Sequence, residues 1–163
     1  MCPLDSGDPL EGAAATPPAL LSTGSPTKDE DPSVLLAADG RVFVAWFSDR
    51  GNNPDIYVAS TNDRRTWSAP VRVTSGPGGD FYPNLLQDSG GVLHLVWFQW
   101  VALFVGQIRH ATSSDGITWS PEEAVTTEFL VDDWVPTVAE APDGSPRARS
   151  SASSGSRRAP RRG

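Results

Sequence analysis

The chain has 163 residues, of which 38% are hydrophobic and 20% are charged, and it includes 15 glycines, 15 prolines and six tryptophans. So many glycines, prolines and aromatic residues argue against a helical bundle and favour short strands joined by turns. The formal net charge of −7 disfavours a nucleic-acid-binding protein, because contacts to phosphates need a basic surface.

The charged residues are unevenly distributed. Residues 1–146 carry all 20 acidic residues and seven of the 13 basic ones, whereas residues 147–163 carry the remaining six arginines and no acid. A single cysteine, Cys2, excludes an intramolecular disulfide framework and a metal cage built from cysteines. We predict no cofactor and no metal site.

The chain begins with a stretch rich in Pro, Ala and Gly, residues 1–28, which we expect to be a flexible lead-in. Its first residues have neither the basic nor the apolar region of a secretory signal peptide. Residues 91–108 carry no formal charge, but they include His94, Gln99 and Gln107, and a spanning helix needs about 20 mostly apolar residues. We therefore predict no transmembrane segment.

An internal repeat organises the middle of the chain. Residues 40–47 return as residues 91–98 at an offset of 51, and residues 63–68 return as residues 115–120 at an offset of 52. A unit of about 50 residues is the size of a four-stranded propeller blade. The repeat predicts a first blade at residues 29–80, a second at 81–132 and the start of a truncated third at 133–144.

Each complete repeat is expected to supply four strands. These are residues 33–37, 42–47, 56–60 and 67–74 in the first repeat, and residues 84–88, 92–98, 108–113 and 119–126 in the second. The second strand of each is apolar on both faces, which is typical of a strand buried between neighbouring sheets. Pro70 and Pro121 fall in the fourth strand, which favours a sheet edge because proline removes a ladder donor.

The predicted fold class is all-β: a partial β-propeller of two four-stranded antiparallel blades plus the first strand of a third, with disordered termini. Residues 145–163 use only five residue types, so they cannot bury a core and should be a disordered Ser/Arg tail. A basic tail can be an arm that binds nucleic acid or membranes. Its abrupt start inside a repeat favours a truncation or an out-of-frame reading instead.

Two similar turns stand before the predicted fourth strands. Residues 113–119, Ser-Ser-Asp-Gly-Ile-Thr-Trp, resemble the Asp-box of the bacterial neuraminidase repeat, Ser-x-Asp-x-Gly-x-Thr-Trp, with one residue missing between Asp and Thr. Residues 60–67 have the full length, but Asn62 stands at the Asp place and Arg64 at the Gly place. The chain thus resembles the sialidase-like superfamily over residues 29–144. The predicted box residues are Ser60, Asp63, Thr66, Trp67, Ser113, Asp115, Gly116, Thr118 and Trp119.

The box is expected to stabilise the fold rather than to catalyse a reaction. Asp, Ser and Thr side chains accept hydrogen bonds from the exposed amides of a short turn, and Gly116 can take a positive φ. Trp67 and Trp119 are then large apolar anchors that pack against each blade.

The resemblance places a ligand site on the opposite face, built from residues 48–55, 75–82, 99–107 and 126–134. The candidate residues on this face are Asp49, Arg50, Asp80, Tyr82, Trp100, Asp133 and Trp134. Asp29, Asp80 and Asp133 each stand three residues before a proline. Carboxylates at equivalent positions suit a hydroxyl-rich sugar or a hard cation, although an aspartate that merely shapes the turn is favoured.

Catalysis of the sialidase type would need more than these residues. The resemblance implies three arginines on the substrate carboxylate, an Asp acid/base and a Tyr nucleophile assisted by Glu, and the Arg-Ile-Pro motif of the family is absent. Tyr82 would need a Glu from another blade, and Arg50 is expected to be a salt-bridged loop residue. His94 is expected to be a packed strand residue, and His110 has no metal-ligand partner at a useful spacing.

The segment at residues 99–105 is almost wholly apolar, whereas its counterpart at residues 48–54 is polar. Exposed apolar patches mark partners, ligands or absent structure. Either this segment packs against an absent blade, with Trp100 as a platform for a sugar ring, or it folds back on its own blade.

These features predict a glycan-binding or scaffold segment without activity of its own, exported or at the cell surface in its parent context. The alternatives are an exo-α-sialidase-like glycoside hydrolase whose catalytic residues lie mostly in absent blades, and an adhesion or protein-interaction propeller. The expected partners are a carbohydrate and either the missing propeller blades or a second copy of the chain.

Overall fold

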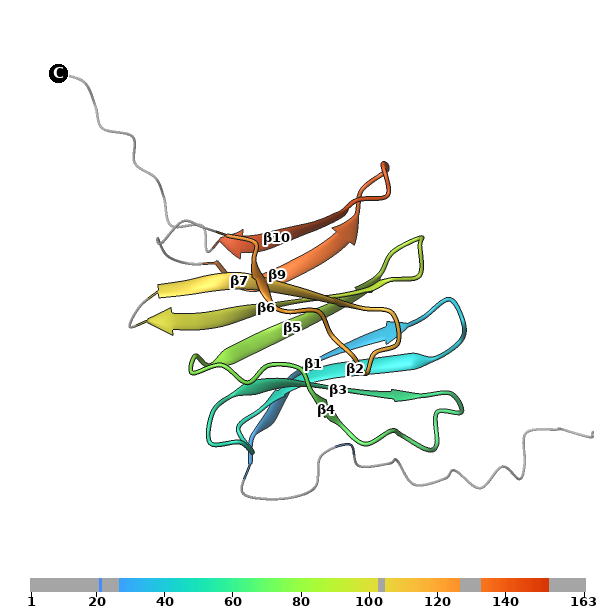
Figure 1. The fold of residues 1–163 in the computed structure, drawn as a ribbon, viewed down its shortest axis with the longest axis horizontal. Coiled ribbons are helices and arrows are strands. Elements are labelled where there is room, and N and C mark those ends of the chain that lie inside the picture. Colours follow the sequence, from blue (N-terminus) through green and yellow to red (C-terminus); the bar gives the residue numbers. More distant parts are fainter. Residues whose placement is uncertain (1–20, 22–26, 103–104, 127–132, 153–163) are drawn as a thin grey trace, which may run out of the picture.

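A computed structural model describes residue 21 and residues 27–102, 105–126 and 133–152. Their regular structure consists of ten β-strands in three antiparallel sheets, which lie one above the other (Figure 1). None of the described residues belongs to a helix that could cross a membrane. The all-β prediction is confirmed.

The first two sheets are the two predicted blades. The first contains β1 (Asp29–Leu36), β2 (Val42–Ser48), β3 (Asp55–Thr61) and β4 (Val71–Arg72), and the second contains β5 (Asp80–Gln87), β6 (Leu93–Ala102), β7 (Val105–Ser113) and β8 (Glu123–Ala124). Within each sheet the strands follow one another in chain order. The fourth strands are shorter than predicted, since each begins only after the proline of its segment and has two residues.

The third sheet is a hairpin of β9 (Asp133–Glu140) and β10 (Pro146–Ala152). Two predictions are therefore corrected. The third unit has two strands instead of one, and the tail is not disordered from residue 145, although residues 153–163 lie outside the described part. Backbone pairing to β9, from Pro146 opposite Glu140 to Ala152 opposite Asp133, does not depend on an apolar composition, and Ala148 packs against the second sheet.

The main core lies between the first and second sheets. Phe43, Ala45 and Phe47 of β2 face Leu93, Leu95 and Trp97 of β6 in one buried cluster. The other face of β2 buries Val44 and Trp46, and the other face of β6 buries Val96 and Phe98 toward the third sheet. Burial on both faces explains why these strands do not alternate between apolar and polar residues, as predicted.

The two box turns have the same hydrogen bonds. Asp63 Oδ1 accepts from the backbone amides of Arg65 and Thr66 at 2.8 and 2.7 Å, and Asp115 Oδ1 accepts from Ile117 and Thr118 at 2.7 and 2.8 Å. These backbone hydrogen bonds lower the pKa of Asp63 to about 2. The structural role predicted for the two aspartates is thus supported by the geometry.

One predicted box residue is corrected. The hydroxyl of the first turn comes from Thr61, which donates to Asp63 at 3.0 Å as Ser113 donates to Asp115 at 3.0 Å. Ser60 has a different role, because its amide donates to the Ser68 hydroxyl. Both turns therefore have the same length, and Arg64, with φ of 60°, occupies the place of Gly116, with φ of 78°.

The box tryptophans sit on different faces of the fold. Trp119 packs against the core between the first two sheets, and Gly116 lies so close to Phe43 of the first blade that a Cβ at residue 116 would overlap the Phe43 ring. Trp67 packs against the cluster of Val44, Trp46 and Tyr57 on the opposite face of the first sheet. The box of the second blade thus joins it to the first.

Candidate functional site

The face opposite the box turns carries a hydrogen bond that both repeats share. Asp29 Oδ1 accepts from the indole Nε1 of Trp46 at 3.1 Å, and Asp80 Oδ1 accepts from Trp97 Nε1 at 2.9 Å. Each bond ties the first residue of an inner strand to the neighbouring strand of the same blade. The aspartates at the blade entrances therefore hold tryptophans in place.

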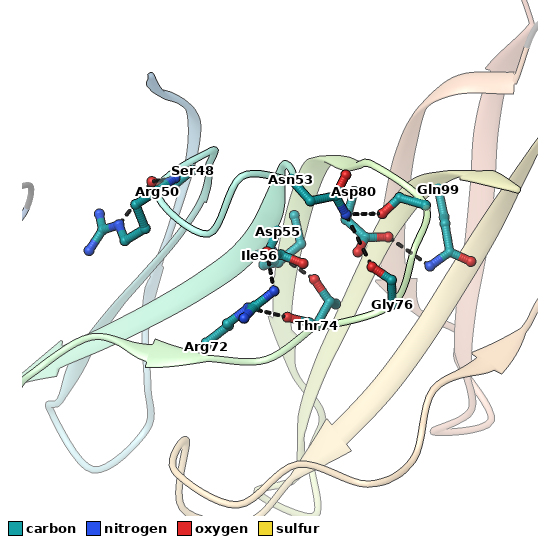
Figure 2. A network of polar contacts seen from close by, with 11 residues as sticks. Ser48, Arg50, Asn53, Asp55, Ile56, Arg72, Thr74, Gly76, Asp80 and Gln99 are labelled. Atoms are coloured by element: carbon teal, nitrogen blue, oxygen red, sulfur yellow. Dashed lines mark hydrogen bonds and ion pairs between the residues drawn. The ribbon is translucent and has the colours of Figure 1, made fainter. Parts of the chain in front are cut away.

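Asp80 is the more deeply buried of the two, with no exposed surface. Its Oδ1 also accepts from Gln99 Nε2 at 2.9 Å, as Figure 2 shows. Its Oδ2 is buried and lacks a well-aligned donor among the described residues. Burial raises the pKa of Asp80 to about 6, against hydrogen bonds from the side chains of Thr74, Gln99 and Trp97 that lower it.

Gln99 extends this network to the next strand, because its Oε1 accepts from Arg109 Nε at 2.9 Å. Arg109 is thus held within the blade. The Asp80 carboxylate lies at the inner end of the network and is shielded from solvent, so it is not presented to a ligand on the surface.

A second buried carboxylate, Asp55, lies at the start of β3. It forms a 2.6 Å ion pair with Arg72 Nη2, and burial raises its pKa although the charge of Arg72 opposes the shift. Asn53 Nδ2 reaches from the β2–β3 turn to the carbonyls of Gly76 and Gly78, at 3.1 and 2.6 Å. These contacts fasten the turn to the link between the two blades (Figure 2).

Arg50 lies apart from this network in Figure 2. Its Nη2 forms a 2.8 Å ion pair with Asp29, its Nε donates to the Ser48 hydroxyl, and its guanidinium lies 4.5 Å from the centroid of the Tyr57 ring. Burial alone would raise the pKa of Asp29, but hydrogen bonds from Ser48, Arg50 and Trp46 and the charge of Arg50 lower it. Arg50 is a salt-bridged residue, as predicted.

A pocket of about 360 Å³ opens where the two blades meet on this face. Aromatic side chains and charged side chains both line it. The lining residues are Lys28, Glu30, Asp31, Phe47, Asp49, Pro54, Phe81 and Tyr82.

Equivalent bulges shape the two sides of this pocket. The register of β1 against β2 shifts between Glu30 and Ser33, and that of β5 against β6 shifts between Phe81 and Asn84. Asp31 and Tyr82, at the two bulges, both have φ of 53°, a conformation that is rare for residues other than glycine. Strained backbone of this kind is concentrated at functional sites.

The polar lining of the pocket is mostly acidic. Asp49 Oδ1 accepts from the Lys28 amide at 2.8 Å, which fixes this carboxylate at the rim. Burial, with the neighbouring charge of Glu30, raises the pKa of Asp31. With three carboxylates and one lysine, the lining disfavours an anionic ligand.

The seven predicted ligand-face residues are thus dispersed. Asp49 and Tyr82 line the pocket, whereas Arg50 and Asp80 are occupied within the blades. Trp100 packs edge-on against Phe98, at 4.9 Å between ring centroids, in the cluster toward the third sheet. Asp133 and Trp134 open β9, and their side chains lie outside the described part of the chain.

The position of Trp100 favours one of the two interpretations of the apolar segment. β6 continues to Ala102 and β7 begins at Val105, so the segment prolongs a hairpin, and residues 103 and 104 lie outside the described part. Trp100 N donates to Gly79 O at 2.9 Å. Trp100 therefore folds back on its own blade.

Asp31 and the two phenylalanines of the pocket were not among the predicted residues. The signal that points to Asp31 is its position, since it precedes Pro32 as Tyr82 precedes Pro83 at an offset of 51. The bulge at this position cannot be read from the sequence, because a regular strand would accommodate the same residues.

No protein-family profile and no curated protein matches this chain. Among solved structures, it is similar to an N-acetylgalactosamine deacetylase from F. plautii, with a TM-score of 0.54 and 16% identity over 72% of this chain and 43% of that one. It is also similar to an α-L-arabinofuranosidase from Clostridium thermocellum, with a TM-score of 0.54 and 15% identity over 75% of this chain and 41% of that one.

An α-L-arabinofuranosidase from Lactobacillus brevis gives a TM-score of 0.53 and 17% identity, over 77% of this chain and 46% of the other. The chain spans less than half the length of each of these three structures. At such identities the likeness concerns the fold alone, and it agrees with the geometry of the sheets: the chain is part of a β-propeller.

Proposed function

We propose that this chain is a glycan-binding segment of a β-propeller protein and that the pocket between its first two blades contacts the sugar. The observation that carries the proposal is the lining of this pocket, which combines Phe47, Phe81 and Tyr82 with the carboxylates of Glu30, Asp31 and Asp49. Apolar rings with a few convergent polar groups are typical of small-molecule sites, and carboxylates accept hydrogen bonds from hydroxyls.

The names of similar structures support this proposal without proving it. Two are arabinofuranosidases, and the deacetylase was solved with a blood group B trisaccharide. We extend only the general class of ligand to this chain, in a parent protein that is exported or at the cell surface.

The charge of the pocket favours a neutral sugar over sialic acid. Recognition of a carboxylate by arginine requires a guanidinium that can approach it, but Arg50 is paired with Asp29 and Arg109 with Gln99. The exo-sialidase alternative would therefore depend on arginines from other blades. An adhesion or protein-interaction propeller remains the third alternative.

The test is calorimetric titration of the purified chain with neutral arabino-, xylo- and galacto-oligosaccharides and with sialyllactose. We expect neutral sugars to bind better than sialyllactose. Tyr82→Ala and Asp31→Asn should each weaken binding about tenfold, roughly 1.4 kcal/mol. Asp39→Asn is the matched control, because Asp39 is an exposed carboxylate in the β1–β2 turn.

Two results would favour an alternative instead. Tighter binding of sialyllactose, unaffected by Asp31→Asn, would contradict the proposed pocket. Release of a fluorophore from a sialoside, abolished by Asp80→Ala, would support the enzyme alternative.

A further inference from the structure

Four titratable side chains form a row across the second sheet, away from the proposed pocket. Asp88, in the β5–β6 turn, contacts His94 Nε2 at 3.1 Å through Oδ2. His94 Nδ1 and His110 Nε2 are 3.0 Å apart, and His110 Nδ1 contacts Glu123 Oε1 of the edge strand β8 at 2.9 Å. The row thus connects a turn, two central strands and the edge of the sheet.

The two imidazoles lie end to end. Their centroids are 5.2 Å apart and their planes differ by 6°, while the facing nitrogens are 3.0 Å apart. Parallel rings can have this centroid distance with such a short nitrogen contact only if the two nitrogens lie nearly on the line between the centroids. The facing nitrogens therefore point at each other, which is the geometry of an N–H···N hydrogen bond.

A metal ion does not fit between these nitrogens. Zinc binds histidine nitrogens at about 2.0–2.1 Å in a tetrahedral arrangement, so the two lone pairs would have to converge at an angle instead of opposing each other. The described residues include no group of three or more side chains suited to a metal. A proton fits the gap as it stands.

The contacts specify how many protons the two rings share. Each outer nitrogen faces a carboxylate, so His94 Nε2 and His110 Nδ1 must both carry a hydrogen. The inner contact needs one more, because one nitrogen must donate and the other accept. Three N–H groups satisfy all contacts, which is one more than two neutral rings carry and one fewer than two charged rings carry.

Either neighbouring protonation state leaves a contact unsatisfied. With two N–H groups, a lone pair must face either another lone pair or a carboxylate. With four, the two inner N–H groups face each other. Because the side chains of His94 and His110 are only 7% and 16% exposed, water compensates poorly for the lost contact.

The charged groups around the row are accounted for. The hydrogen bond from His94 is the main cause that lowers the pKa of Asp88. From the third sheet, Glu140 accepts from Ser89 beside Asp88, and Arg147 pairs with Asp143. Among the described side chains, these charges of the third sheet are engaged elsewhere and no bond joins them to either imidazole.

The fold itself does not require this row. At the corresponding places in the first repeat, the chain has Ala37, Phe43, Val58 and Val71, which are all apolar. The first blade is thus assembled without such contacts, and the row is a property of the second blade alone.

We propose that Asp88, His94, His110 and Glu123 form a single-proton clamp that holds the edge strand β8 and the β5–β6 turn to the second blade. The clamp is closed when the two imidazoles share three N–H protons. It loosens when this proton is released at higher pH, and also when a further proton is added at lower pH.

The first test follows the imidazole nitrogens of the ¹⁵N-labelled full chain by NMR from about pH 5 to about pH 9, the range in which histidine titrates. We expect each titration step to appear at the same pH in both rings, as coupled groups require. Glu123→Gln should displace the titration curve of His94, although Glu123 contacts only His110. Glu122→Gln, the same charge change one residue away, should displace neither curve.

The second test measures the edge strand directly. The amide of Val125 donates to Ile108 O at 2.8 Å, so its hydrogen exchange reports on the attachment of β8. At one pH, we expect several-fold faster exchange in His110→Gln than in the wild type or in Glu122→Gln. Independent titration of the two rings, or equal exchange rates in these three proteins, would overturn the proposal.

Discussion

Asp80 combines complete burial with a charge that burial opposes. Its pKa of about 6 lies above the ordinary value of 3.8, so the folded chain holds this proton more tightly than the unfolded chain does. Between these two pH values, stability must fall as the pH rises, because the folded state then binds more protons than the unfolded state. Above pH 6 the full penalty for an ionised Asp80 is present.

Asp80→Asn should remove this penalty. The amide oxygen can still accept from Trp97 and Gln99, but the side chain no longer titrates. We expect the wild type to lose roughly 3 kcal/mol between about pH 4 and pH 7 from this group, and the variant to lack this loss. Urea unfolding at several pH values measures the difference, with Asp39→Asn as the exposed control. An unchanged pH dependence in Asp80→Asn would contradict the prediction.

The residue pairs that repeat were accessible from the sequence, and those set by strand register were not. The offset of 51 relates Asp29 to Asp80 and Trp46 to Trp97, so the sequence alone makes the equivalence of these positions visible. The contact between His94 and His110 depends on how β6 and β7 are paired. For this reason, each histidine considered alone pointed to a packed residue without a partner.

At the scale of single elements, the box turn of the second blade anchors one sheet on another. Trp119 packs into the core between the first two sheets, whereas Trp67 packs on the other face of the first sheet. The same residue at equivalent positions therefore tests the anchoring role in two surroundings.

Trp119→Ala should lower the free energy of unfolding by about 3 kcal/mol, the lower end for a large aromatic residue removed from a core. Trp67→Ala should cost less than half as much, because no second blade among the described residues covers the cluster on which it packs. Chemical denaturation of both variants at one pH measures the two values. Equal costs, or a cost below about 0.5 kcal/mol for Trp119→Ala, would refute the anchoring role of the second box.

The strands that bury apolar side chains were predictable, and β10 was not. β2 and β6 are apolar on both faces, and each begins within one residue of its predicted start. β10 reads Pro-Arg-Ala-Arg-Ser-Ser-Ala, a composition that indicates disorder because it buries little. Its strand conformation comes from backbone hydrogen bonds to β9, which composition does not reveal.

At the scale of the whole molecule, the outer face of the first sheet carries apolar side chains that remain exposed. Val34 is 66% exposed and Leu36 is 61% exposed, and both point away from the core because Leu35 between them packs into it. Val34 lies opposite Val44 and Leu36 opposite Val42 in the register. Exposed neighbouring apolar residues on a sheet face favour contact with another surface.

We therefore expect the isolated chain to self-associate through this face. Sedimentation velocity at increasing protein concentration should show species larger than the monomer, and the double variant Val34→Lys, Leu36→Lys should shift the distribution to the monomer, because two ammonium groups cannot be buried without partners. Ile117→Lys is the control, since Ile117 is also 66% exposed but lies in the box turn of the second blade. A wild-type chain that stays monomeric at every concentration, with a cooperative melt, would show that this face needs no cover.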